Sequence, residues 1–169
     1  LGIKNKKILV LPYRFNIGCP YQCIFCGASD MSDFRVISPK KAVEEIKELS
    51  EKYNTKYFFF MSHTINISKK YILEFCDEII KQNLNIYWSD CARVNNMDEE
   101  ILKKMKKAGC IRLIYGLETG SKRMLKYINK RISLEQVSKV IRMTNNVDIW
   151  TCIEIIAGLP TETKQDVED

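Results

Sequence analysis

The strongest constraint on the fold is a repeated alternation between short apolar runs and amphipathic helical segments. The expected strands cover residues 14–18, 57–61, 85–90, 111–115 and 149–157, with a further short strand at 8–11. Each strand-and-helix unit takes roughly 30 residues, which is typical of parallel strands joined by crossover helices. The chain is therefore predicted to be α/β. The alternation alone leaves two architectures open, a barrel and a doubly wound sheet.

Capping residues indicate where the helices begin. The expected helices start at or just after Pro39, Ser68, Asp98 or a neighbouring asparagine, Ser121 and Ser133. Gln136 lies three residues after Ser133, which is the spacing of a capping box. Gly109 is expected to end the helix that Asp98 begins. The final residues, TETKQDVED, resemble the first turn of another helix.

Several apolar residues are predicted to form the core. Residues 57–61 are almost all apolar, which favours a parallel strand buried on both faces. Trp88 and Trp150 lie on expected strands and are assigned to the core. Cys76 lies on a helix and Cys110 at the start of a strand, and both are interpreted as packing residues.

The overall composition fits one globular domain. The 169 residues, 46% of them hydrophobic, are expected to form a single domain over residues 1–169, incomplete at its C-terminus. The net charge of +6 comes mainly from lysines at helical spacing among glutamates, which favours a solvated surface over a nucleic-acid interface. With neither a membrane-spanning apolar run nor a signal peptide in the sequence, a cytoplasmic location is expected.

Seven cysteines are the most informative residues for function. Three of them, Cys19, Cys23 and Cys26, form a CxxxCxxC motif in a loop after the first expected strand. Clustered thiolates select zinc or an iron–sulfur cluster. A structural zinc site needs a fourth ligand, which would have to be His63, the only histidine, or a distant cysteine. Three ligands on a four-iron cluster leave one iron open for chemistry.

Together with three further segments, the cysteine motif resembles the radical S-adenosylmethionine (SAM) superfamily. Residues 116–121, GLETGS, are similar to the family's G-x-E-S/T-G segment, and residues 127–130, YINK, follow at the usual distance. Residues 156–163, IAGLPTET, are similar to its IxGLPGET stretch. The likeness covers nearly the whole chain. It is strongest to the branch with methylthiotransferases, cobalamin-dependent enzymes and oxygen-independent coproporphyrinogen oxidases.

The resemblance implies a partial parallel (β/α)6 barrel of the TIM-barrel type, cut after the fifth strand, with its active site at the carboxyl ends of the strands. It implies a [4Fe–4S] cluster on the three motif cysteines, with SAM on the open iron. A radical formed from SAM would then abstract hydrogen from an unknown substrate. An electron donor such as flavodoxin or ferredoxin is implied. Cobalamin is implied only through a domain absent from this chain.

The same resemblance implies roles for five SAM-binding residues. Phe25 would pack beside the adenine, and Glu118 would contact the methionine or ribose of SAM. Lys130 lies where relatives often have arginine and would meet the SAM carboxylate. Ile156 and Gly158 would form the floor under the adenine.

The sequence leaves alternatives for several single residues and for the function. His63 is either a proton donor or substrate contact, or a polar residue in a surface loop. Cys91 and Cys152 are favoured as packing thiols over auxiliary ligands or radical relays. Alternation along the strands predicts a buried pair between Arg112 and Glu154. The alternative function is a non-catalytic iron–sulfur or zinc module, and an RNA-binding role rests on the charge alone.

Overall fold

A five-stranded parallel sheet organises the molecule. The computed structural model describes residues 7–30 and 33–169. The strands of the sheet are β1 (Val10–Tyr13), β4 (Tyr57–Phe60), β5 (Tyr87–Ala92), β6 (Cys110–Glu118) and β7 (Trp150–Ile155). They lie side by side in chain order, each parallel to the next, so β1 and β7 form the two edges of an open sheet.

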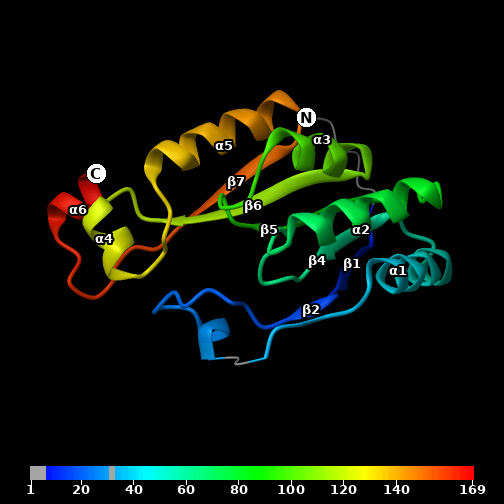
Figure 1. Cartoon of the computed structure of the whole chain (residues 1–169), viewed down its shortest axis with the longest axis horizontal. Coiled ribbons are helices and arrows are strands. Elements are labelled where there is room, and N and C mark those ends of the chain that lie inside the picture. The colour runs from blue at the N-terminus through cyan, green and yellow to red at the C-terminus, as the bar shows by residue number, and fades with distance from the viewer. Residues whose placement is uncertain (1–6, 31–32) are drawn as a thin grey trace.

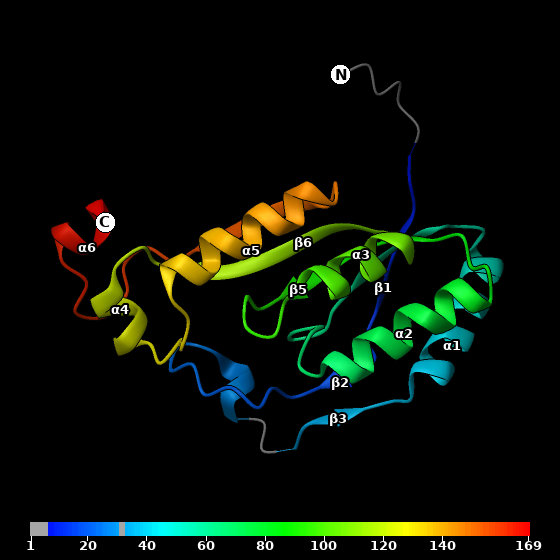
Figure 2. The same ribbon diagram turned by 45° about the horizontal axis from the view of Figure 1, so that its top comes forward.

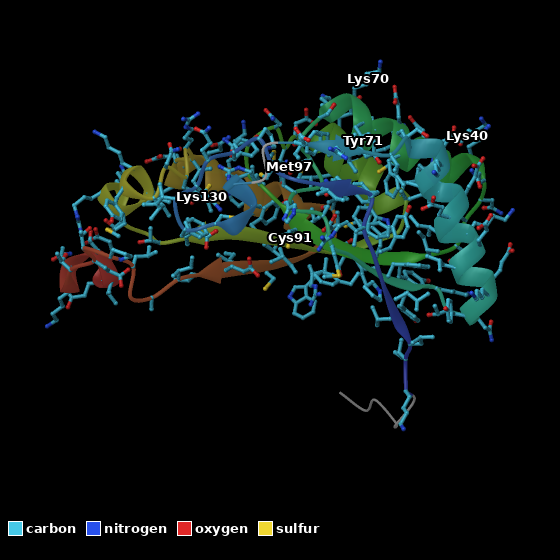
Figure 3. The ribbon with its side chains drawn as sticks, turned by 90° about the horizontal axis from the view of Figure 1, so that it is seen from below. Lys40, Lys70, Tyr71, Cys91, Met97 and Lys130 are labelled. Carbon is cyan, nitrogen blue, oxygen red and sulfur yellow. The ribbon has the colours of Figure 1, made fainter. Side chains whose placement is uncertain are left out.

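Four helices cover one face of this sheet (Figures 1 and 2). They are α1 (Pro39–Tyr53), α2 (Lys69–Lys81), α3 (Glu99–Lys107) and α5 (Leu134–Asn146). Two shorter helices, α4 (Lys122–Tyr127) and α6 (Lys164–Glu168), lie beyond the carboxyl ends of β6 and β7. Figure 3 shows the helices on one side of the strands, and side chains without a covering helix on the other. A doubly wound sheet has helices on both faces. The sequential strand order and the one-sided helices therefore identify the barrel-type winding of the two architectures.

The first strand of the sheet differs from the prediction. The strand expected at 14–18 is reduced to β2 (Asn16–Ile17), which pairs only with β3 (Arg35–Val36) in a separate antiparallel ribbon. The edge strand of the main sheet is β1, which overlaps the further short strand that was expected at residues 8–11. Pro12 lies within β1. Proline lacks the amide hydrogen needed in a central strand but is tolerated at an edge.

The predicted helix caps are largely confirmed. The side chains of Ser38, Ser68, Asp98, Ser121 and Ser133 each accept a backbone N–H three residues further along the chain. Only half of the capping box at Ser133 forms: Ser133 Oγ accepts the Gln136 amide at 3.1 Å, and the side chain of Gln136 donates through Nε2 to the Val94 carbonyl. A complete capping box joins Thr163 and Asp166 at the start of α6.

The core lies between the sheet and the helices. Phe58, Phe60 and Trp88 are buried there, and the Phe60 and Trp88 rings stack with centroids 5.2 Å apart. Cys76 and Cys110 are also fully buried, as predicted. Alternate residues of β4 face the other way and are only half-buried, so this strand is not fully covered on both faces.

Two predictions about the uncovered face were wrong. Trp150 is 69% exposed, because it lies on the edge strand β7 on the side without helices. The Arg112–Glu154 pair does not form, since Arg112 lies beside Trp150 in the register while Glu154 lies beside Gly116, four residues further along. Arg112 donates to Ser89 Oγ instead.

In the described part of the chain, no helix is long and apolar enough to span a bilayer.

Candidate functional site

The three motif cysteines lie in a loop over residues 18–26, here called the cysteine loop. Gly18 begins it with a φ of 80°, and a Cβ at this position would lie 2.6 Å from the Asp33 carbonyl oxygen. Only glycine fits such a turn without strain. Two contacts attach the loop to the segment after α4. The Ile24 amide donates to the Ile128 carbonyl at 3.1 Å, and Asn129 Nδ2 donates to the Gln22 carbonyl at 2.7 Å.

A cavity of about 490 Å³ opens between the cysteine loop and the carboxyl ends of the strands. Cys19, Cys23 and Cys26 line one wall. The opposite walls come from the ends of β5, β6 and β7 and from the segments that follow β4 and α4. This is the end of the sheet at which barrel enzymes carry their active sites.

The three thiols line the same cavity, and clustered thiolates select zinc or an iron–sulfur cluster. Within the described residues, no three His, Cys, Asp or Glu side chains are close enough together to hold one metal ion. Burial raises the pKa of the Cys19 thiol, and the nearby Arg93 charge opposes this shift.

A buried ion pair forms the next part of the cavity wall. Lys130 Nζ lies 2.6 Å from Glu118 Oε1, and both side chains are more than nine-tenths buried. Glu118 ends β6 with a φ of 71°, and its carbonyl accepts the Ile156 amide at 2.9 Å. Gly116 leaves room for the pair, because a Cβ there would lie 2.3 Å from Glu118 Oε1 and 2.8 Å from Lys130 Nζ.

Four of the five residues assigned to SAM by resemblance line this cavity. Phe25 does so with its ring centroid 5.6 Å from Lys130 Nζ, and Ile156 follows β7 on the far side. Gly158 is not part of the lining. It lies in the turn after β7 with a φ of 83°, and its amide donates to Glu162 Oε2 at 2.7 Å.

Sequence reasoning missed Arg93, which is 8% exposed and follows β5 directly. Its Nη1 donates to Cys23 Sγ at 3.4 Å, and its guanidinium carbon lies 3.9 Å from the centroid of the Tyr21 ring. The available signal was its position, a charged residue immediately after a strand at the carboxyl end.

Of the three residues whose roles the sequence left open, His63 and Cys91 line the cavity and Cys152 does not. His63 lines the cavity, and its buried Nε2 has no hydrogen-bond partner in the described residues. Burial lowers the pKa of His63, and the charge of Arg14 adds to this shift. Cys91 also lines the cavity, and burial raises the pKa of its thiol to about 12. Cys152 is half-buried on β7 and is not part of the lining.

Asp90 attaches β5 to the segment that leads to His63. Its carboxyl group is completely buried and accepts the Cys91 amide at 2.7 Å and the Ser62 amide at 3.2 Å. The Ser62 hydroxyl also bonds to it. Burial raises the pKa of Asp90 well above its usual range.

This burial predicts a pH-dependent stability. The native state holds the Asp90 proton more tightly than the unfolded chain, so the free energy of unfolding falls as pH rises through the native pKa. Asp90→Asn keeps an acceptor for both amides and has no carboxyl proton to lose. We expect its unfolding free energy to decline less with pH than that of the wild type. Urea unfolding from weakly acidic to weakly alkaline pH tests this, and parallel profiles would contradict it.

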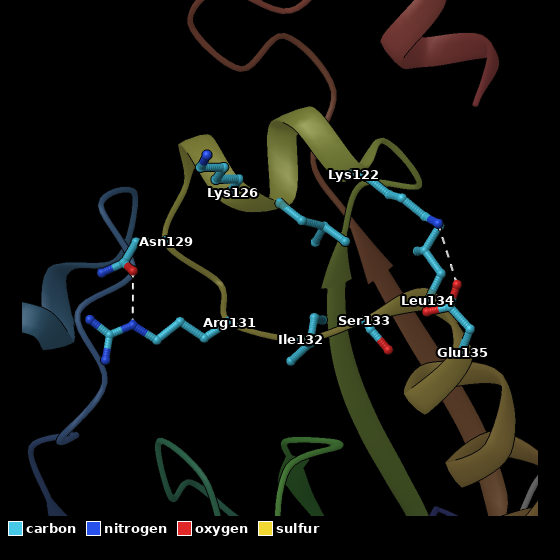
Figure 4. Close-up of a pocket in the computed structure, with 9 residues that line it drawn as sticks. Lys122, Lys126, Asn129, Arg131, Ile132, Ser133, Leu134 and Glu135 are labelled. Carbon is cyan, nitrogen blue, oxygen red and sulfur yellow. Dashed lines mark hydrogen bonds and ion pairs between the residues drawn. The ribbon is translucent and has the colours of Figure 1, made fainter.

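A second hollow, of about 450 Å³, lies outside this cavity between α4 and the start of α5 (Figure 4). Its rim carries Lys122, Lys126 and Arg131, with Lys122 paired to Glu135 at 3.4 Å. Arg131 Nε donates to Asn129 Oδ1 at 2.9 Å. No thiol lines this hollow, so the cavity at the cysteine loop is the better candidate for chemistry.

Comparison with known proteins finds one family model and several related proteins that match this chain. The sequence profile of the radical SAM superfamily matches residues 13–169. The anaerobic magnesium-protoporphyrin IX monomethyl ester cyclase of Rubrivivax gelatinosus is 32% identical over 168 residues, which are 98% of this chain and 30% of that protein.

Two solved structures share the fold. The radical SAM methyltransferase TsrM of Kitasatospora setae, solved with cobalamin and a [4Fe–4S] cluster, has a TM-score of 0.84 at 18% identity. The match covers 93% of this chain and 32% of TsrM. The coproporphyrinogen III oxidase HemN of Escherichia coli has a TM-score of 0.66 at 16% identity, over 93% of this chain and 39% of that one. The chain thus spans about a third of the length of these relatives.

Proposed function

Because the chain belongs to the radical SAM superfamily, we propose that it is the part of such an enzyme that holds a [4Fe–4S] cluster on Cys19, Cys23 and Cys26. SAM would bind beside the cluster in the same cavity. Enzymes of this superfamily use a [4Fe–4S] cluster and SAM. When bound, these cofactors supply a 5′-deoxyadenosyl radical that abstracts hydrogen from a substrate. The observation that carries the proposal is the single cavity lined by the three thiols and the Glu118–Lys130 pair.

The residues of the cavity bind and orient SAM in this proposal. The Glu118 carboxylate accepts hydrogen bonds from an ammonium or hydroxyl group, and the Lys130 ammonium attracts the SAM carboxylate. Phe25 and Ile156 offer apolar surface to the adenine. The buried pair keeps both charges fixed before SAM arrives, so little reorganisation is needed on binding.

Gly158 contributes to SAM binding indirectly in this proposal. Its left-handed turn ends the segment after β7 and so positions Ile156, which is the residue that reaches the cavity. Its conformation favours glycine.

The partners follow from the same proposal. Radical SAM enzymes need a reductant, and we propose a flavodoxin or ferredoxin in this role. Cobalamin would be bound outside residues 1–169, by a domain of a longer protein. A cytoplasmic location stays a prediction from the sequence, and so does the preference for a solvated basic surface over a nucleic-acid interface.

Cluster assembly tests the proposal directly. Anaerobic reconstitution with iron and sulfide is expected to load about four irons and four sulfides per chain, as the cluster formula requires. Cys23→Ser is expected to lose most of this loading. Cys152→Ser is the matched control, because Cys152 lies outside the cavity lining, and it should load as the wild type does. One zinc per chain without sulfide would instead indicate the structural zinc module.

A further inference from the structure

The side chain of Arg93 connects three parts of the site. Its Nη1 donates to Cys23 Sγ at 3.4 Å, its Nη2 donates to the Lys130 carbonyl, and its Nε donates to Asn95 Oδ1 at 3.1 Å. The face of the guanidinium lies over the Tyr21 ring. Two of these contacts are with the cysteine loop, and one is with the backbone of the residue that pairs with Glu118.

The backbone of Arg93 is itself held in place. Its amide donates to Asn66 Oδ1 at 3.0 Å, and Asn66 Nδ2 donates to the Arg93 carbonyl at 2.7 Å. Asn66 is 1% exposed, so these bonds are shielded from water. The guanidinium is therefore presented from a fixed position, as residues that orient a reactive group need to be.

No ion pair joins Arg93 to a carboxylate among the side chains that the structure describes, those of residues 7–28 and 33–169. Its acceptors there are two neutral oxygens and the Cys23 sulfur. A buried cation without a counter-charge is costly. The one acceptor that can become an anion is the Cys23 thiolate, which suits a guanidinium hydrogen bond when it binds iron.

We infer that Arg93 is a positioning residue that fixes Cys23 and raises the reduction potential of the cluster through its hydrogen bond and positive charge at this sulfur. The inference rests on the proposed function. Reduction adds negative charge to a cluster, and a hydrogen bond or a cation at a ligating sulfur stabilises the reduced state. Arg93 thereby makes the cluster easier to reduce. Contacts with the Tyr21 ring and the Lys130 carbonyl fix the position of its guanidinium relative to the cysteine loop.

The experiment is a redox titration of the reconstituted protein followed by electron paramagnetic resonance, with iron and sulfide content measured on the same samples. Arg93→Gln removes the charge and the contact at sulfur. Arg93→Lys keeps the charge but loses the planar fork. Arg131→Gln is the matched control, because Arg131 is an exposed arginine on the adjacent segment and its loss changes the net charge equally.

We expect Arg93→Gln to shift the midpoint potential to a more negative value and to lower cluster loading. Arg93→Lys should lie between it and the wild type, and Arg131→Gln should titrate as the wild type does. An unchanged potential in Arg93→Gln, or an equal shift in Arg131→Gln, would overturn the inference. If Arg93→Gln does not fold, Arg93→Lys decides, with a lower potential supporting the inference and an unchanged one overturning it. A wild-type protein that assembles no cluster would instead contradict the proposed function.

Discussion

Lys130→Met is expected to reduce the free energy of unfolding by about 3–5 kcal/mol, because it leaves the buried Glu118 carboxylate without a counter-charge. Methionine has a similar length and fills the space of the lysine stem. The measurement is urea unfolding followed by circular dichroism at neutral pH. Lys126→Met is the matched control, since Lys126 is an exposed lysine of α4, and we expect it to change stability little.

A second variant separates the loss of the charge pair from simple misfolding. In Glu118→Gln/Lys130→Met, neither charge remains, so most of the lost stability should return. A Lys130→Met protein as stable as the wild type would show that the carboxylate reaches water or another partner. A double variant no better than Lys130→Met would show that packing, and not charge, dominates.

Gly116→Ala is expected to weaken SAM binding by roughly tenfold or more, which corresponds to about 1.4 kcal/mol or more. The new Cβ would lie inside contact distance of both Glu118 Oε1 and Lys130 Nζ, so the charged groups have to move. The fold should persist, because the atoms in contact are the ends of side chains and Gly116 has no positive φ.

Equilibrium binding of SAM to the reconstituted protein measures this effect. Gly27→Ala is the matched control, because a Cβ at Gly27 meets nothing within 4 Å, and its SAM affinity should equal that of the wild type. Equal affinity in Gly116→Ala and the wild type would contradict a role for the Glu118–Lys130 pair in SAM binding.

The fold was predictable where local rules and long-range packing agree. Capping serines and an aspartate specified the helix starts, and the apolar runs specified four of the five strands of the sheet. The first strand was misplaced because residues 14–18 carry enough apolar character for a strand but pair only with β3. The exposure of Trp150 follows from its place on an edge strand, and apolar character alone does not reveal which strand will be an edge.

The candidate site was predictable where a motif carries its residues, as with the three cysteines, Glu118 and Lys130. The contact of Arg93 with Cys23 joins residues 70 positions apart in the chain, so a local sequence pattern cannot predict it. The predicted Arg112–Glu154 pair failed for a related reason. Alternation indicates which face of a sheet a side chain occupies, but the register decides how far along the strand it lies.

The most direct test of the central claim is the formation of 5′-deoxyadenosine from SAM by the anaerobically reconstituted, reduced protein, measured by liquid chromatography. The account predicts SAM-dependent formation in the wild type and in Cys152→Ser, and its loss in Cys23→Ser. A protein that holds a full cluster but forms no 5′-deoxyadenosine, both as residues 1–169 and within a full-length enzyme, would contradict the account and leave a passive iron–sulfur module.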